Sequence, residues 1–398
     1  MPPSRGTVRG AKVTFCPASP TPAEAIGAAA ARVAQNGSRR RAVRRFGEGL
    51  ATDPTRVPAM LRSCLVAAVA SLLCAAGFDA GAQNAPTLYG LLDASASRIR
   101  PLGGGDNRWQ LDSGSMSGSF IGFRGSDDLG GGLRAVYRLE SYVRVDTGSS
   151  GRNATDAFFS HDANVGLSGA FGTTVIGRNV TPLYLATIAY NPFGESFGFS
   201  PSTRQWYAGA VLGDRSWSNS LAYTNNATDA PLRLRLAANF LEDAPGSGRN
   251  VGGSAAYASG PFSVVLAGER IKNSPLPLPA GFRSQTAYML GGTYDFGIVR
   301  VYAQAGRVRT HASVAGSDSR TTLGQIGATL PLGNGVVLVA YGRSRMQTSL
   351  SRVTDEQASL GYDYFLSKNT DIYLAGLYEK TYQLSSGNAI AGGVRLRF

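Results

Sequence analysis

The sequence predicts an all-β protein, a transmembrane β-barrel of sixteen antiparallel strands. Apolar and polar residues alternate in many segments after residue 88, as in 232–240, 299–305 and 394–398, and such alternation puts the two kinds on opposite faces of a strand. Connections between these segments alternate between short and long, as in barrels that cross a membrane. No run of eighteen apolar residues follows residue 82, which excludes helical spans.

Residues 1–59 are rich in Arg, Ala and Pro and show no apolar period. We interpret them as a disordered extension, or as sequence that lies upstream of the true start site. A basic nucleic-acid arm and an organelle transit peptide are the alternatives. A secretory signal begins directly after this segment, which favours a disordered extension or upstream sequence over the two alternatives.

Residues 60–82 are typical of a secretory signal peptide, with a positive start at Arg62, the apolar stretch Leu65–Gly77 and a small-x-small site at Ala80–Ala82. A lipoprotein signal at Cys74 is the competing interpretation. It requires a small residue before the cysteine, and that position is occupied by a leucine. We therefore expect export, with the barrel domain formed by residues 83–398.

Composition argues against several classes of function. Residues 1–82 carry +7 of the formal net charge of +13, and the other charges alternate with apolar residues instead of clustering, so no nucleic-acid partner is predicted. All three cysteines precede residue 83, which leaves no thiolate metal site or cysteine nucleophile in the barrel.

The two histidines, His161 and His311, lie in different predicted elements, and hydrolase and zinc motifs are absent. We expect no enzyme, no cofactor and no metal site. An outer-membrane phospholipase with a Ser–His pair is the remaining enzymatic alternative.

The predicted connections fall into two classes that differ in length. The short turns, rich in Gly, Pro, Asn and Asp, are 127–131, 169–172, 227–231, 260–261, 295–297, 331–334 and 366–369. The longer connections include 100–113, 145–157, 242–248, 273–284 and 311–319. We expect the short turns on the periplasmic side and the long connections outside.

The stretch from about 180 to 215 is the longest one without a strand-like pattern. Irregular loops of this length are uncommon in compact domains unless they are functional. We expect it to fold into the barrel lumen, where it would narrow a water-filled pore.

Several segments together resemble a known family. They are Leu88–Asp93, Gly122–Ala135, Val165–Gly169 and Asn191–Glu195, followed by the aromatic terminus Phe398. In order and spacing they are similar to the trimeric general porins of Gram-negative bacteria, especially the β-proteobacterial branch. The resemblance covers residues 88–398. It implies a sixteen-stranded homotrimer in the outer membrane, surrounded by lipid and lipopolysaccharide, that passes small hydrophilic solutes and ions by diffusion and is narrowed by an inward-folded third loop.

The resemblance also implies which residues line the constriction. In related porins, basic side chains on the wall face acidic ones on the third loop. Arg178, which directly precedes the loop, Arg124 on the second strand and Arg215 after the loop match basic positions, and Glu195 matches the acidic one.

Two departures make the expected basic cluster thinner. Phe120 and His161 stand where the family commonly has arginine, and we place both at the constriction. A general diffusion pore and a solute-selective, anion-preferring channel on the same fold remain open, and a secreted β-rich adhesin is a third hypothesis.

Alternation puts further charged residues on the lumen face of the predicted strands. They are Arg134, Arg138, Glu140, Arg233, Arg235, Arg300, Arg395 and Arg397. We expect most of them to be ordinary solvated wall residues, away from the constriction.

Overall fold

The computed structural model describes residues 85–225, 231–240, 249–275, 278–314 and 317–398. The predicted extension (1–59) and signal peptide (60–82) lie outside these ranges. So do residues 226–230 and 241–248, which hold most of one predicted turn and one predicted long connection.

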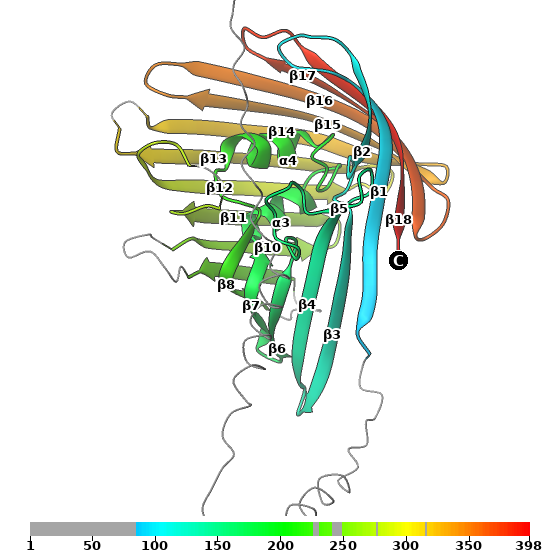
Figure 1. Cartoon of the computed structure of the whole chain (residues 1–398), viewed down its shortest axis with the longest axis vertical. Coiled ribbons are helices and arrows are strands. Elements are labelled where there is room, and N and C mark those ends of the chain that lie inside the picture. Colours follow the sequence, from blue (N-terminus) through cyan, green and yellow to red (C-terminus); the bar gives the residue numbers. More distant parts are fainter. Residues whose placement is uncertain (1–84, 226–230, 241–248, 276–277, 315–316) are drawn as a thin grey trace, which may run out of the picture. The chain divides into compact units, whose positions relative to one another are not determined.

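Strands make up most of the described chain (Figure 1). The wall strands are β1 (Thr87–Arg100), β3 (Phe120–Gly130), β4 (Leu133–Arg144), β6 (Ala163–Gly169), β7 (Gly172–Val180), β8 (Ser216–Thr224), β9 (Leu232–Asn239), β10 (Val251–Ser259), β11 (Phe262–Ile271), β12 (Phe282–Asp295), β13 (Arg300–Ala312), β14 (Ser319–Leu332), β15 (Gly335–Gln347), β16 (Arg352–Phe365), β17 (Thr370–Thr381) and β18 (Gly387–Arg397). The remaining elements are the short strands β2 (Arg108–Ser113) and β5 (Ser149–Ser150), the helices α3 (Pro182–Ala189) and α4 (Pro201–Gln205), and the π-helical turn η1 (Trp206–Ala210).

The sheet closes on itself. Each wall strand pairs antiparallel with its neighbours in the sequence, and β1 pairs with β18 on one side and with β3 on the other. The protein is therefore a closed barrel of sixteen antiparallel strands, which confirms the predicted fold class. Closure leaves no strand edge unpaired, as a wall surrounded by lipid requires.

The two faces of the wall differ as the alternation predicts. On β11, Val265 and Ala267 are 2% exposed, whereas Leu266 between them is 61% exposed. On β12, Met289 is 1% exposed, whereas the next residue, Leu290, is 55% exposed. The exposed apolar face is the one suited to lipid, and the buried face carries the inner layer of the molecule.

Two predicted connections are shorter than expected, because strands run into them. β3 continues to Gly130, so the first turn is only Gly131-Gly132, and all three glycines of Gly130–Gly132 have positive φ, the backbone region that glycine adopts most readily. The predicted connection 100–113 was wrong in its second half, because Arg108–Ser113 forms β2 and pairs with β1.

Residues 114–119 separate β2 from β3 and fold against the inner side of β1. The Asp93 carboxylate accepts hydrogen bonds from the backbone N–H groups of Met116 and Ser117, at 2.8 and 2.7 Å. Tyr373 donates its hydroxyl to the same carboxylate at 2.6 Å. Asp93 is fully buried, so these donors offset the loss of its hydration.

Residues 181–215, which we call the inner segment, contain α3, α4 and η1. The prediction of an irregular loop was wrong in this respect. Both helices have a side-chain cap followed by proline: Thr181 accepts from the Tyr184 N–H and Ser200 from the Thr203 N–H. The helices have eight and five residues, too few to show a clear helical period. No described helix is long and apolar enough to span a membrane.

The inner segment packs on the buried face of the wall. α3 contacts β9 to β12, and α4 contacts β14 to β16. Leu183, Tyr190 and Trp206 form one apolar cluster with wall residues such as Met289 and Val308. This cluster fixes the segment across one half of the barrel wall.

Three buried wall glutamines bond to this segment, one each on β12, β13 and β14. Gln304 accepts from the Ser202 hydroxyl at 2.7 Å and donates to the Thr187 carbonyl at 2.8 Å. Gln325 accepts from the Ser202 N–H, and Gln285 accepts from the Leu212 N–H, each at 2.8 Å. These glutamines supply hydrogen-bond partners for buried groups of the segment, and the bonds help to fix its position.

Replacing Gln304→Ala should loosen the inner segment. It leaves the Ser202 hydroxyl without its acceptor, which costs about 1–3 kcal/mol. It also removes one hydrogen bond to the Thr187 carbonyl, which keeps the one from the Asn191 side chain. We expect faster cleavage within residues 181–215 when a protease is added to the folded protein. Thr322→Ala, which removes an exposed hydroxyl from the neighbouring strand, is the control. Equal cleavage of both variants and the wild type would contradict this role for Gln304.

Candidate functional site

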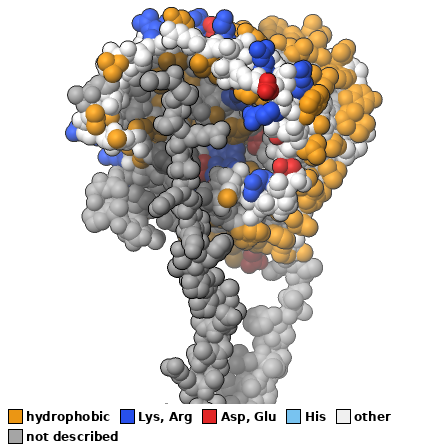
Figure 2. Space-filling view, turned by 45° about the horizontal axis from the view of Figure 1, so that its top comes forward, with side chains coloured by type: hydrophobic (Ala, Val, Ile, Leu, Met, Phe, Trp, Pro, Cys, Tyr) orange, Lys and Arg blue, Asp and Glu red, His pale blue; other side chains and the backbone are white. Residues whose placement is uncertain are grey.

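Charged side chains gather where the end of the inner segment meets β4 and β7. A chamber of about 400 Å³ lies there, lined by three arginines, three aspartates and three aromatic residues. The charged lining residues are Asp112, Arg144, Asp146, Arg152, Asp214 and Arg215. Figure 2 shows Lys/Arg and Asp/Glu side chains inside the opening of the barrel and hydrophobic ones over much of the visible outer wall.

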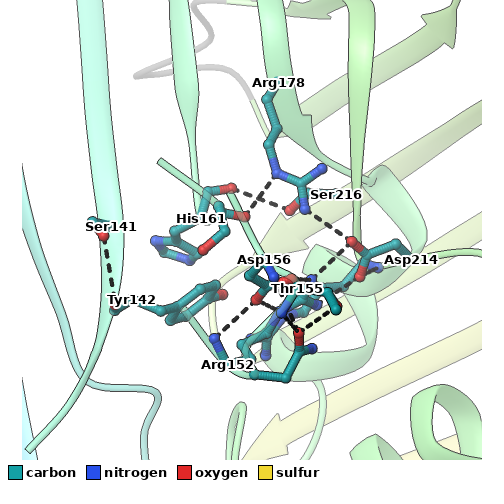
Figure 3. A network of polar contacts seen from close by, with 12 residues as sticks. Ser141, Tyr142, Arg152, Thr155, Asp156, His161, Arg178, Asp214 and Ser216 are labelled. Atoms are coloured by element: carbon teal, nitrogen blue, oxygen red, sulfur yellow. Dashed lines mark hydrogen bonds and ion pairs between the residues drawn. The ribbon is translucent and has the colours of Figure 1, made fainter. Parts of the chain in front are cut away.

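Asp214 joins Arg152 and Arg178 in the polar network that Figure 3 shows. Its two carboxylate oxygens accept from Arg152 at 2.7 and 3.1 Å, and one of them also accepts from Arg178 at 2.8 Å. Arg152 donates in addition to both oxygens of Asp156, at 2.7 and 2.8 Å. Two arginines and two aspartates thus form one network in which the charges balance.

The network also determines the ionisation of its acids. Burial alone would raise the pKa of the Asp214 carboxyl, but hydrogen bonds and attraction from Arg152 and Arg178 lower this pKa below its usual range. The same holds for Asp156. Burial would raise the pKa of its carboxyl, but hydrogen bonds and attraction from Arg152 outweigh this effect and lower the pKa. Both aspartates therefore stay ionised throughout the neutral range.

Arg215 is in a different situation. It is 7% exposed, and its guanidinium carbon lies 4.4 Å from the centre of the Tyr142 ring and 5.1 Å from that of Phe197. Within the described chain it forms no ion pair, and its Nε has no hydrogen-bond partner. Stacking on aromatic rings stabilises the cation without cancelling its charge. Arg144, which lines the same chamber, also has an unpartnered Nε.

Glu195 comes near this cation from the tip of the inner segment. Its carboxyl is hydrogen-bonded to the Gly118 backbone and interacts electrostatically with His161 and Arg215. Burial is the largest influence and raises the pKa of Glu195 above its usual value, although these partners oppose it. This acid therefore takes up a proton at a higher pH than an ordinary glutamate does.

Phe120 and His161 lie together, as neighbours in an aromatic cluster on the buried face. Their ring centres are 5.2 Å apart, and the Tyr142 ring lies 4.5 Å from His161. His161 Nδ1 is 2.5 Å from a Glu140 carboxylate oxygen. The cluster occupies the space beside Arg215 with rings instead of additional arginines.

Arg124 lies apart from the other predicted site residues. It is exposed in the middle of β3, with its guanidinium 4.6 Å from the Tyr89 ring. The strand pairing places it opposite Thr87 and Arg138. The structure therefore brings together Arg178, Arg215, Glu195, Phe120 and His161, but not Arg124.

Other lumen-facing arginines predicted from the alternation are mostly paired with acids. Arg138 contacts Asp162 at 3.2 Å, and Arg300 contacts Asp295 at 2.8 Å. Arg395 and Arg397 both bind Asp371, at 2.7 and 2.6 Å. These pairs are structural charges whose fields largely cancel.

Sequence reasoning missed Arg152, Asp156 and Asp214. Asp214 directly precedes Arg215, which was a usable signal. Arg152 belongs to the predicted outer connection 145–157, and nothing in its local pattern indicates that it returns to residue 214. In the described part of the chain, no group of three or more His, Cys, Asp or Glu residues is placed to hold a metal ion.

Comparisons with known proteins agree with this architecture. A model of the Gram-negative porin family matches residues 66–382. Outer membrane porin protein 32 of Delftia acidovorans is 31% identical over 82% of this chain and 94% of its own length. An outer membrane porin protein of Bordetella pertussis is 26% identical over 83% of this chain and 98% of its own length.

The structure is likewise similar to a solved one, the anion-selective porin from Comamonas acidovorans. The TM-score is 0.67 at 26% sequence identity, over 79% of this chain and all of the other. These relatives are channels, and the secreted-adhesin hypothesis finds no support among them. The chain belongs to the Gram-negative porin family, and it is an outer-membrane protein that forms a β-barrel channel.

Proposed function

We propose that the inner segment narrows a water-filled lumen and that the channel passes small hydrophilic solutes and ions with a modest preference for anions. The observation that carries the preference is Arg215, a buried cation that forms no ion pair with any residue that the structure describes. Arg152 and Arg178 contribute little net charge, because Asp156 and Asp214 balance them. The assignment of the constriction to Arg178, Glu195, Arg215, Phe120 and His161 is part of this proposal.

The preference should be modest because the chamber lining also holds acids. Asp112 and Asp146 face the same space as Arg144 and Arg215. Pairs of charges in contact with water are worth about 0.2–1 kcal/mol, which corresponds to permeability ratios of a few-fold. A strictly anion-selective channel is the second candidate, favoured by the same unpaired arginine and by the description of the Comamonas acidovorans porin as anion-selective.

We further infer a homotrimer embedded among outer-membrane lipids, as the family resemblance implies. No catalytic step is assigned to the chain. A gel in SDS without boiling tests the assembly, because a trimeric barrel should migrate as a large species that heat converts to the monomer.

Arg215→Gln should shift ion preference toward cations. The change removes the unpaired charge from the chamber, whereas Arg215→Lys retains it. The measurement is the zero-current potential of the refolded protein in a planar bilayer under a KCl gradient. The anion-to-cation permeability ratio derived from it should fall a few-fold for the glutamine variant and much less for the lysine variant.

Arg134→Gln is the matched control, because Arg134 is an exposed arginine near the short-turn end of β4. A shift of equal size in this control would show that total charge, and not Arg215, determines the preference. Identical potentials in wild type and Arg215→Gln would refute the assignment of Arg215.

Acidification should increase anion preference through Glu195. Its raised pKa means that it binds a proton at a pH above that of an ordinary glutamate, about 4.3. As pH falls through this raised pKa, the site loses a negative charge. Glu195→Gln should already show the increased preference at neutral pH and should lack this step.

The measurement is the zero-current potential of both proteins across the acidic range. The difference between the two curves is the quantity of interest, because it isolates the contribution of the Glu195 carboxyl. Parallel curves for wild type and Glu195→Gln would contradict a titrating role for this acid.

A further inference from the structure

A second cavity lies on the inner face of the wall, at the short-turn end of β10 to β13. It has a volume of about 620 Å³, and Ala189 and Tyr190 at the C-terminal end of α3 line one side of it. We call it the vestibule pocket. The residues described around it do not include any that line the chamber at Arg215. The charges that we assign to ion preference therefore belong to a different place in the lumen.

The register of the wall strands builds the floor of this pocket. Ala258, Ser263, Thr293 and Tyr302 pair in one row across β10, β11, β12 and β13, and all four line the pocket. Ser263 lies two residues from Val265, which is buried on the inner face, so the row faces the lumen. Residues from four strands thus present hydroxyl groups and an aromatic ring to the same space.

Tyr190 is held at the edge of this row. Its hydroxyl lies 2.7 Å from the Ser263 hydroxyl, and either group can donate in this hydrogen bond. The Tyr190 ring lies against Gly291, where a Cβ atom would come within 3.1 Å of a ring carbon. The absence of a side chain on the glycine therefore allows this close approach. The polar groups of the pocket are in place before a solute enters, which lowers the entropic cost of binding.

One ion pair supplies the charges of the pocket. Arg300 donates to one Asp295 carboxylate oxygen at 2.8 and 3.2 Å, and the other oxygen accepts from the Gly297 N–H at 2.8 Å. Among the described residues these two are the only charged ones that line the pocket, so their charges cancel. The Arg300 and Asp295 side chains are 51% and 35% exposed. The guanidinium N–H groups that the pair does not use can therefore reach a solute.

We propose that the vestibule pocket binds a small neutral solute with several hydroxyl groups, such as a mono- or disaccharide. Hydroxyl groups both donate and accept hydrogen bonds, so they match the Arg300–Asp295 pair as well as the hydroxyls of the row. The Tyr302 ring offers an apolar surface to the C–H face of a sugar ring. The volume lies in the range of small-molecule sites, about 300–1,000 Å³. An anion is disfavoured, because Asp295 already balances the arginine.

This proposal rests on the water-filled lumen proposed above, through which a solute reaches the pocket. The pocket lies at the end of the barrel with the short turns, which we expect to face the periplasm. A hydroxylated solute would bind there briefly on its way through the channel.

The test uses single channels of the full chain, exported and purified from outer membranes in detergent and inserted into a planar bilayer in KCl. Maltose, a neutral disaccharide, is added in increasing concentration, and each bound molecule should interrupt the ion current briefly. The variant Asp295→Asn/Arg300→Gln leaves the net charge unchanged, and the asparagine carbonyl can still accept from the Gly297 N–H. We expect its apparent affinity for maltose to be about tenfold lower.

Arg343→Gln/Glu356→Gln is the matched control. It removes an ion pair of similar exposure, 50% and 38%, on the outer face of the wall, and it should bind maltose as wild type does. Equal affinity of wild type and Asp295→Asn/Arg300→Gln would overturn the proposal, as would an equal loss in the control. Conducting channels that maltose never interrupts would overturn the pocket alone. An absence of conductance steps from correctly folded protein would overturn the channel function, and this proposal with it.

The location is tested by Ala258→Phe, which fills the pocket without changing charge. Ala258 is exposed on the lumen face, so the larger side chain can be accommodated. This variant should lose affinity for maltose but keep the ion preference of wild type, and unchanged maltose binding would overturn the assignment to this pocket. Interruptions by free glutamine, a zwitterionic amino acid, with none by maltose would overturn the assignment to neutral solutes.

Discussion

The closed ladder of backbone hydrogen bonds is the constraint on which the rest of the structure depends. A wall in lipid has no water to satisfy its backbone groups, so every strand must be paired on both sides. The pairing of β1 with both β18 and β3 meets this condition. Once the wall is closed, alternate side chains must face lipid or lumen, and polar groups that would be costly outside become available inside.

The inner segment uses those polar groups as anchors. Gln285, Gln304 and Gln325 replace the water that its backbone would otherwise need, and an apolar cluster around Trp206 excludes solvent from one side. With the segment held in this way, Asp214 and Arg215 enter the chamber side by side. The first is neutralised by Arg152 and Arg178, whereas the second forms no ion pair within the described part of the chain. Two adjacent residues therefore have different charge environments.

The sequence was sufficient to predict most of the fold but only part of the site. Strand number, barrel closure and most short turns follow from alternation and turn chemistry, which are local. β2 was missed although Arg108–Ser113 alternates polar and apolar residues, because so short a pattern beside a glycine-rich stretch is also compatible with a connection. The helices of the inner segment were missed because eight and five residues are too few to show a clear helical period. Of the residues that the resemblance assigns to the constriction, Arg178, Arg215 and Glu195 lie near one another, whereas Arg124 lies apart from them, because strand parity gives the face of a residue but not its height along the barrel.

The sequence by itself determined the two faces of the wall, the alternation of short and long connections and the family, because each depends on neighbours in the chain or on the order of motifs. Only the tertiary structure decided which charges cancel. Arg152 and Asp214 are 62 residues apart, and their pairing depends on the path of an outer connection that has no periodic pattern. The same holds on the outer face of the wall, where Arg309 and Arg320 lie side by side only because the register of the ladder aligns their strands.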